Sequence, residues 1–105
     1  MKNFLVVLAL VTLQGCSWVE LDPAAEQIRV VEEQHVEGCR LLGKTTVSVK
    51  STVAGVARKE ETMQQELETL ARNHALDLNG DTIVAISAIK DGTRVYNVYR
   101  CKQAN

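Results

Sequence analysis

The side chains best suited to chemistry in this sequence are its three cysteines and two histidines. Thiolates and imidazoles bind soft metal ions. The residues from which such a site could be assembled are His35, Cys39, His74 and Cys101. They lack the close Cys-x-x-Cys or His-x-x-x-His spacing that is typical of zinc sites. We therefore expect neither a metal nor another cofactor.

The first fifteen residues have the order of an export signal. Lys2 is followed by an apolar run from Phe4 to Leu13 and by a small Gly15. That run is far shorter than the roughly 20 residues of a membrane-spanning helix. The segment Leu13-Gln14-Gly15-Cys16 resembles the lipobox of bacterial lipoproteins, whose cysteine is acylated and becomes the mature N-terminus. An ordinary signal peptide cut near Cys16 is the alternative.

The cysteine count agrees with this interpretation. Acylation of Cys16 would leave Cys39 and Cys101 as an even pair in an oxidising compartment, where a disulfide is expected. Each buried methylene contributes about 0.8 kcal/mol, so several acyl chains on Cys16 would hold the protein to a membrane. Ser17 is compatible with sorting to the outer membrane, since an aspartate there would resemble an inner-membrane retention signal. We expect lipid anchoring at the periplasmic face of the outer membrane.

Length and charge leave room for one small domain. We expect residues 1–15 to be the signal peptide, residues 16–27 the lipidated N-terminus and a tether, and residues 28–105 a single domain. From Cys16 onward the chain carries 11 basic and 13 acidic residues, a formal charge of −2. This balance gives no indication of nucleic-acid binding.

The clearest predicted element is a helix from Thr62 to Leu78. Its apolar stripe recurs at spacings of three and four: Met63, Leu67, Leu70, Ala71, His74, Ala75 and Leu78. Thr62 and Gln65 fit a capping box at its start. Asn79-Gly80 favours the left-handed conformation that ends a helix.

Strand-forming residues flank this helix on both sides. Residues 28–31 and 39–49 precede it, with a mobile connection expected over residues 51–59. Residues 82–88 and 94–100 follow it and are joined through Asp91-Gly92, a strong hairpin signal. The order is β-β-α-β-β. It predicts an α+β domain with one amphipathic helix on a short sheet, closed by the disulfide.

Asn73 and His74 are the other candidate contact residues. His74 falls within the apolar stripe, where a partly buried histidine with one hydrogen bond is favoured over a catalytic base. Asn73 lies toward the edge of the stripe, where a hydrogen bond to neighbouring backbone is favoured over ligand contact. No serine stands at a suggestive offset from a histidine, and no glycine-rich phosphate loop is present, so we expect no enzyme.

Four segments carry a likeness to a known family: residues 28–34, Gly38-Cys39-Arg40-Leu41-Leu42-Gly43, Leu70-Ala71-Arg72-Asn73-His74-Ala75, and Val98-Tyr99-Arg100-Cys101. The chain resembles the YjeI-type family of small uncharacterised lipoproteins of Gram-negative bacteria. It is more distantly similar to the envelope-stress sensor lipoprotein RcsF and to YbjQ-type domains. Relatives have two glycines and an asparagine after the helix, where this chain has Asn79-Gly80-Asp81.

The resemblance implies a fold and a location more than an activity. We expect a non-enzymatic interaction or structural module at the outer membrane, related to envelope structure or stress, with the membrane and another envelope protein as partners. A small-ligand or metal-binding periplasmic lipoprotein is the alternative. Fold alone does not decide between them.

Overall fold

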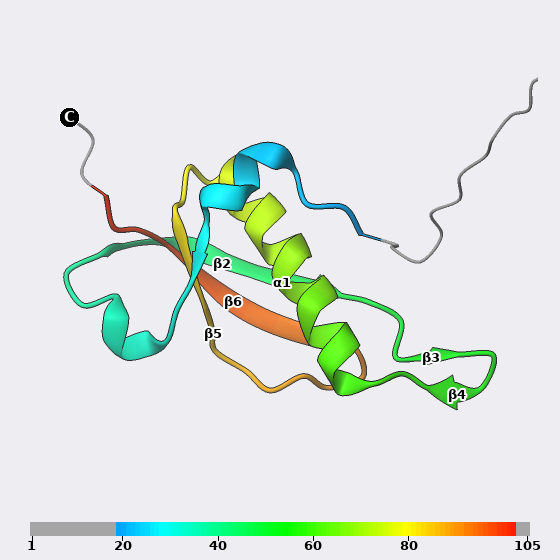
Figure 1. Ribbon diagram of the computed structural model, residues 1–105. Coiled ribbons are helices and arrows are strands. Elements are labelled where there is room, and N and C mark those ends of the chain that lie inside the picture. Colours follow the sequence, from blue (N-terminus) through cyan, green and yellow to red (C-terminus); the bar gives the residue numbers. More distant parts are fainter. Residues whose placement is uncertain (1–18, 103–105) are drawn as a thin grey trace, which may run out of the picture.

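The computed structural model describes residues 19–102. The elements, in chain order, are η1 (Pro23–Gln27), β1 (Arg29–Val30), η2 (Glu33–His35), β2 (Arg40–Ser48), β3 (Thr52–Val53), β4 (Val56–Ala57), α1 (Glu60–Asp77), β5 (Thr82–Ala85) and β6 (Thr93–Arg100). Helix α1 lies across one face of a mixed sheet (Figure 1). The predicted α+β fold is confirmed.

The main sheet has the strand order β1-β5-β6-β2. β6 pairs antiparallel with both β5 and β2, and β1 adds a short parallel edge to β5. The long β2–β6 ladder runs from the pair Arg40 and Arg100 to the pair Ser48 and Thr93, with one irregularity between Leu41 and Gly43. This is the predicted β-β-α-β-β order, with one further small hairpin between β2 and α1.

The core lies between α1 and the sheet. Every fourth residue of the helix, from Met63 through Leu67 and Ala71 to Ala75, is buried there. The sheet contributes Val47, Ile83, Tyr96 and Val98. This assigns the face of β6 that meets the helix, which alternation alone left open. Of the predicted stripe, His74 and Leu78 are exposed instead, because they lie at the edge of the helix face that the sheet covers.

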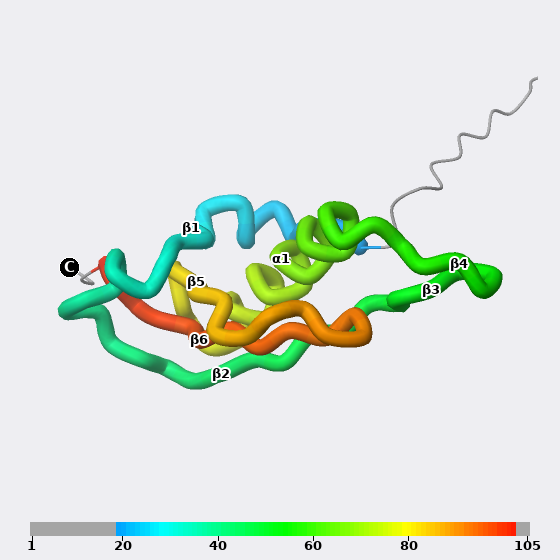
Figure 2. The backbone as a smooth tube through the Cα atoms, turned by 90° about the horizontal axis from the view of Figure 1, so that it is seen from below, coloured from blue at the N-terminus to red at the C-terminus, as the bar shows by residue number. Residues whose placement is uncertain are grey.

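The segment expected to be a tether is packed against the domain. Asp22 caps η1 by accepting a hydrogen bond from the Ala24 N–H, and Pro23 occupies the first turn. Ala25 and Ile28 belong to the core, and η1 contacts α1 on the side away from β2 (Figure 2). Within the described residues, the prediction of a tether up to Gln27 is therefore wrong: the domain includes residues 19–27.

The sequence predicted where α1 ends better than where it begins. The helix begins after Lys59, which makes no side-chain capping bond, so the predicted capping box at Thr62 is wrong. Two glutamates in the first turn, Glu60 and Glu61, suit the positive end of the helix dipole instead. At the other end Asn79 adopts φ 63°, as predicted. Gly80 leaves space for Val98, whose Cγ1 would lie 2.3 Å from an added Cβ.

Two tight turns have positive φ at both central residues, the type I′ pattern of two-residue hairpins. Asp91 and Gly92 have φ values of 52° and 77°, which confirms the predicted hairpin. Ala54 and Gly55 have φ values of 54° and 79° and join β3 to β4. The mobile connection predicted for residues 51–59 is thus a second hairpin. It extends beyond the N-terminal end of α1 (Figures 1 and 2).

The predicted disulfide joins Cys39 to Cys101, with the Cα atoms 4.4 Å apart. The two cysteines lie immediately outside the first pair of the β2–β6 ladder, Arg40 and Arg100. The bond therefore closes the open end of the longest ladder in the described chain.

Replacing both cysteines, Cys39→Ser with Cys101→Ser, should lower the free energy of unfolding by up to about 4 kcal/mol, because the bond closes a 62-residue separation and restricts the unfolded chain. Urea unfolding followed by circular dichroism measures this difference. A difference near zero would mean that the bond adds nothing to stability.

Candidate functional site

The cysteines and histidines considered for a metal site do not form one cluster. Cys39 and Cys101 are bonded to each other. Between residues 19 and 102 no group of three or more His, Cys, Asp or Glu side chains is arranged to hold a metal ion. Cys16, the predicted lipidation site, lies outside the described residues.

His74 and Asn73 lie side by side in a polar surface hollow that residues 20–23 also line. The His74 Nδ1 is 2.9 Å from the Thr45 hydroxyl on β2. The expected single hydrogen bond is present, but the expected partial burial is wrong, because the side chain lies over the edge of the sheet, where solvent reaches it.

Asn73 binds the backbone of the N-terminal segment at two points. Its Oδ1 accepts a hydrogen bond from the Asp22 N–H at 2.8 Å, and its Nδ2 donates to the Glu20 carbonyl at 2.9 Å. The amide thus satisfies a donor and an acceptor of a segment that has no strand partner there. The sequence favoured a backbone contact for Asn73 over ligand contact, but the partners are 51 and 53 residues away in the sequence and not neighbouring residues.

Arg72 continues the same attachment. Its Nε donates to the Ile28 carbonyl at 3.1 Å and its Nη2 to the Glu26 carbonyl at 2.9 Å. Two adjacent helix residues therefore make four hydrogen bonds to residues 20–28. We call this group of contacts the N-terminal clamp. The role of Arg72 was not predicted, since its partners lie more than 40 residues away in the sequence.

Asn73→Ala should release residues 20–23 and accelerate hydrogen exchange of the Asp22 amide, while costing about 1 kcal/mol of stability for the lost bonds. Arg72→Ala should do the same at residues 26–28. Hydrogen exchange read by NMR measures both effects.

Gln65→Ala, at an exposed position of the same helix, is the matched control and should leave exchange in residues 20–28 unchanged. Equal exchange rates in Asn73→Ala and the parent chain would show that the clamp does not hold the segment.

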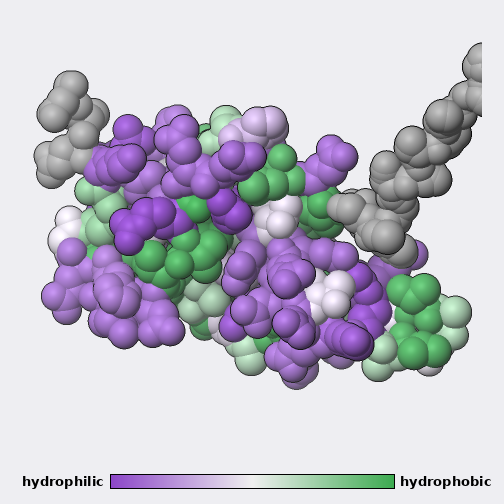
Figure 3. Space-filling view, in the orientation of Figure 1, coloured by the Kyte–Doolittle hydropathy of each residue, from purple (hydrophilic) through white to green (hydrophobic). Residues whose placement is uncertain are grey.

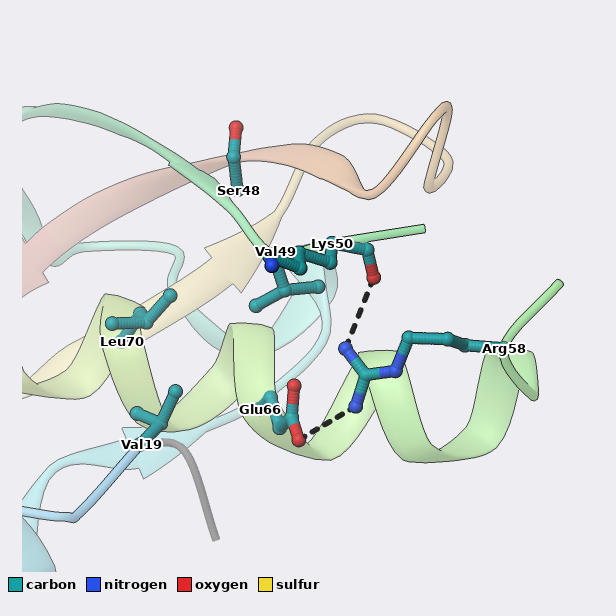
Figure 4. Close-up of a pocket in the computed structure, with 7 residues that line it drawn as sticks. All are labelled: Val19, Ser48, Val49, Lys50, Arg58, Glu66 and Leu70. Atoms are coloured by element: carbon teal, nitrogen blue, oxygen red, sulfur yellow. Dashed lines mark hydrogen bonds and ion pairs between the residues drawn. The ribbon is translucent and has the colours of Figure 1, made fainter. Parts of the chain in front are cut away.

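A pocket of about 430 Å³ lies where the described chain begins. Val19, Val49 and Leu70 form its apolar side, and Arg58 and Glu66 form its polar side (Figure 4). Arg58 donates to a Glu66 carboxylate oxygen at 2.9 Å and to the Lys50 carbonyl at 3.0 Å. The pair is largely shielded from solvent and fixes the base of the β3–β4 hairpin to α1.

A second, more polar pocket of about 510 Å³ lies between β1, α1 and β6. Tyr96 is fully buried, and its hydroxyl has no hydrogen bond of ordinary geometry. Burial raises the pKa of Tyr96, the positive charge of Arg94 lowers it, and Glu68 raises it further, with a net rise. The Arg94 guanidinium carbon is 5.9 Å from the centre of the Tyr96 ring.

Asp81 ties down the C-terminal end of the domain. Its carboxylate accepts hydrogen bonds from the backbone N–H groups of Cys101 and Lys102, each at 2.8 Å, and from the Thr82 hydroxyl at 2.9 Å. Burial works to raise its pKa, but these bonds and the Arg100 charge outweigh burial, so the pKa lies below its ordinary value of 3.8.

A lowered pKa in the folded state gives a stability contribution that is present above pH 3.8 and is lost as the pH falls through the folded-state pKa. Asp81→Asn should therefore be less stable than the parent chain near neutral pH, with the difference shrinking below pH 3.8. Thermal unfolding at a series of pH values measures this.

The control is Asp77→Asn, which alters an exposed carboxylate on α1. It should not reproduce this pH dependence. A gap between Asp81→Asn and the parent chain that stays constant into strong acid would contradict the role of the charged carboxylate.

No helix in the described part of the chain is both long and apolar enough to cross a membrane.

Fold, disulfide and clamp together define a small, disulfide-closed α+β domain whose N-terminal segment is bound to its helix. Residues 19–101 match the family model described as a domain of unknown function, DUF4156. The chain is 30% identical over 88 residues to the uncharacterized protein YjeI of Escherichia coli K12, covering 83% of this chain and 75% of that protein. YjeI of Shigella flexneri matches equally. This chain belongs to that family, as its motifs indicated. No solved structure matches it.

Proposed function

We propose that this protein is a lipoprotein of the outer membrane, anchored through acylated Cys16 and facing the periplasm, and that it acts by contact with another envelope component. The sequence support is the signal-like N-terminus ending in Leu13-Gln14-Gly15-Cys16. The structural support is the Cys39–Cys101 disulfide, which leaves Cys16 as the one remaining cysteine of the three.

The observation that carries the proposal is the short separation in sequence between Cys16 and the ordered domain. Glu20 is already held by Asn73, so the proposed anchor lies only four residues before the first clamped residue. A chain of four peptide steps spans at most about 14 Å. The anchor would therefore hold the domain at the membrane surface, where an exposed face could meet a neighbouring envelope protein.

The anchor is tested by the intact mass and N-terminal peptide of the mature protein from membranes. We expect a chain that begins at Cys16 and carries several acyl chains, and we expect Cys16→Ser to appear in the soluble fraction. A mature chain that begins elsewhere, or that lacks acylation, would refute the anchor.

The contact role is tested by crosslinking the tagged protein in intact cells and identifying the attached protein. The same partner should be captured repeatedly, and capture should fall with Cys16→Ser, which removes the anchor but leaves the folded domain. Absence of a specific partner, together with no envelope phenotype on gene deletion, would count against this role.

A second candidate function is binding of a small polar ligand, favoured by the pocket around Tyr96. This pocket of about 510 Å³ has a mostly polar lining, drawn from β1, α1 and β6. Arg94, Gln64 and Glu68 offer further polar contacts around the same space.

Glu68→Gln removes a negative charge from the lining of this pocket while keeping the size of the side chain, and it should leave stability nearly unchanged. Native mass spectrometry of the purified protein would show a bound small molecule in the parent chain and its loss in Glu68→Gln. An identical mass in both proteins, without a bound species, would refute this function.

A further inference from the structure

The β3–β4 hairpin presents an apolar tip that no other part of the described chain covers. From Val53 to Ala57 the sequence is Val-Ala-Gly-Val-Ala, without a polar side chain. All of these residues are exposed, and Val56 is 67% accessible to solvent. Figure 3 shows the tip as a hydrophobic patch bordered by hydrophilic surface. A projecting apolar surface of this kind marks a contact site.

The geometry of the turn strengthens this interpretation. Ala54 occupies the left-handed region with φ 54°, a conformation that costs an alanine energy and that asparagine, aspartate or glycine adopts more readily. The equivalent position of the other type I′ turn holds Asp91. An apolar residue at Ala54 thus keeps the tip apolar at a local energetic cost, and backbone strain of this type is concentrated at functional segments.

The hairpin is held in a fixed direction at its base. It forms its own two-stranded sheet, separate from the main one. An isolated hairpin of this size is marginal in water. Here Arg58 connects it to the Lys50 carbonyl and to Glu66 on α1. The tip therefore projects from the domain as a defined feature and not as a loose loop.

The base of the hairpin lies beside the start of the described chain. Val19, Lys50 and Arg58 line one pocket, and Figures 1 and 2 both show the hairpin at the end of the domain where the described chain begins. The tether from Cys16 to Glu20 spans at most about 14 Å. The hairpin projects by three to four residues, which corresponds to roughly 12 Å at the rise per residue of a β-strand. Anchor and tip can therefore meet the same surface.

We propose that the tip of the β3–β4 hairpin, residues 53–57, inserts into the lipid surface that holds Cys16, and so fixes which end of the domain faces the membrane. This inference rests on the proposed lipid anchor. The contact is apolar in character, because the hairpin base balances its charges: Lys50, Arg58 and Lys59 lie close in sequence or space to Glu60, Glu61 and Glu66.

The test uses the acylated full-length mature protein in vesicles of phosphatidylethanolamine and phosphatidylglycerol. Trp18, the single tryptophan, is replaced by phenylalanine, and Val56→Trp becomes the reporter. Lipids brominated near the top of their acyl chains quench a tryptophan that enters the membrane. We expect a blue shift and loss of most of the Val56→Trp emission, with little change when phosphatidylglycerol is omitted.

The matched control is Leu41→Trp in the same background, since Leu41 is also exposed but lies near the disulfide at the start of β2. Its emission should not be quenched. Equal quenching at both positions, no quenching at either, or a blue shift at position 56 without quenching would overturn the inference. The last result would indicate that the tip contacts a second copy of this chain and not lipid.

A separate measurement tests the anchor itself. The mass of each reporter protein shows whether Cys16 is acylated. An acylated protein with an unquenched Val56→Trp refutes hairpin insertion and leaves the anchor in place. A protein without acyl chains refutes the anchor and this inference with it.

Discussion

The attachment of residues 20–28 to α1 is the constraint on which the rest of the account depends. Four hydrogen bonds from Arg72 and Asn73 hold this segment, and Ala25 and Ile28 enter the core beneath it. Without these bonds the segment would be a tether, and the domain could take any orientation relative to an anchor at Cys16. With them, the proposed anchor would lie four residues before the first clamped residue, Glu20, and would determine which end of the domain faces the membrane.

The C-terminal end of the described chain is held by a disulfide and by hydrogen bonds to a carboxylate. There the Cys39–Cys101 disulfide closes the β2–β6 ladder, and the Asp81 carboxylate binds the backbone beyond it. The negative charge of Asp81 strengthens those backbone bonds. A domain with a modest core is thus fastened near both ends of the described chain, which adds to the stability that a small core supplies.

Features that are recorded in residue periodicity, turn composition or cysteine number could be predicted from the sequence. The four-residue repeat from Met63 to Ala75, the turn at Asp91-Gly92 and the pairing of Cys39 with Cys101 were all predictable. Distant partners were not predictable. The contacts of Arg72 were missed, and for Asn73 a backbone bond was predicted but not its partners, which lie 51 and 53 residues away. η1 did carry a signal, since Asp22-Pro23 is a common helix start. His74 is exposed because it lies at the edge of the sheet, and the apolar repeat of the helix does not indicate where that edge lies.

Neutron reflectometry of the acylated protein on a supported bilayer tests the central claim most directly, because it measures the water layer between headgroups and protein. The clamp predicts that protein density begins within about 14 Å of the headgroups, the reach of four peptide steps. It also predicts that Arg72→Ala combined with Asn73→Ala moves the domain outward. A thicker water layer in the parent protein, or an unchanged layer in the double variant, would contradict the claim that the domain is held at the membrane by its own helix.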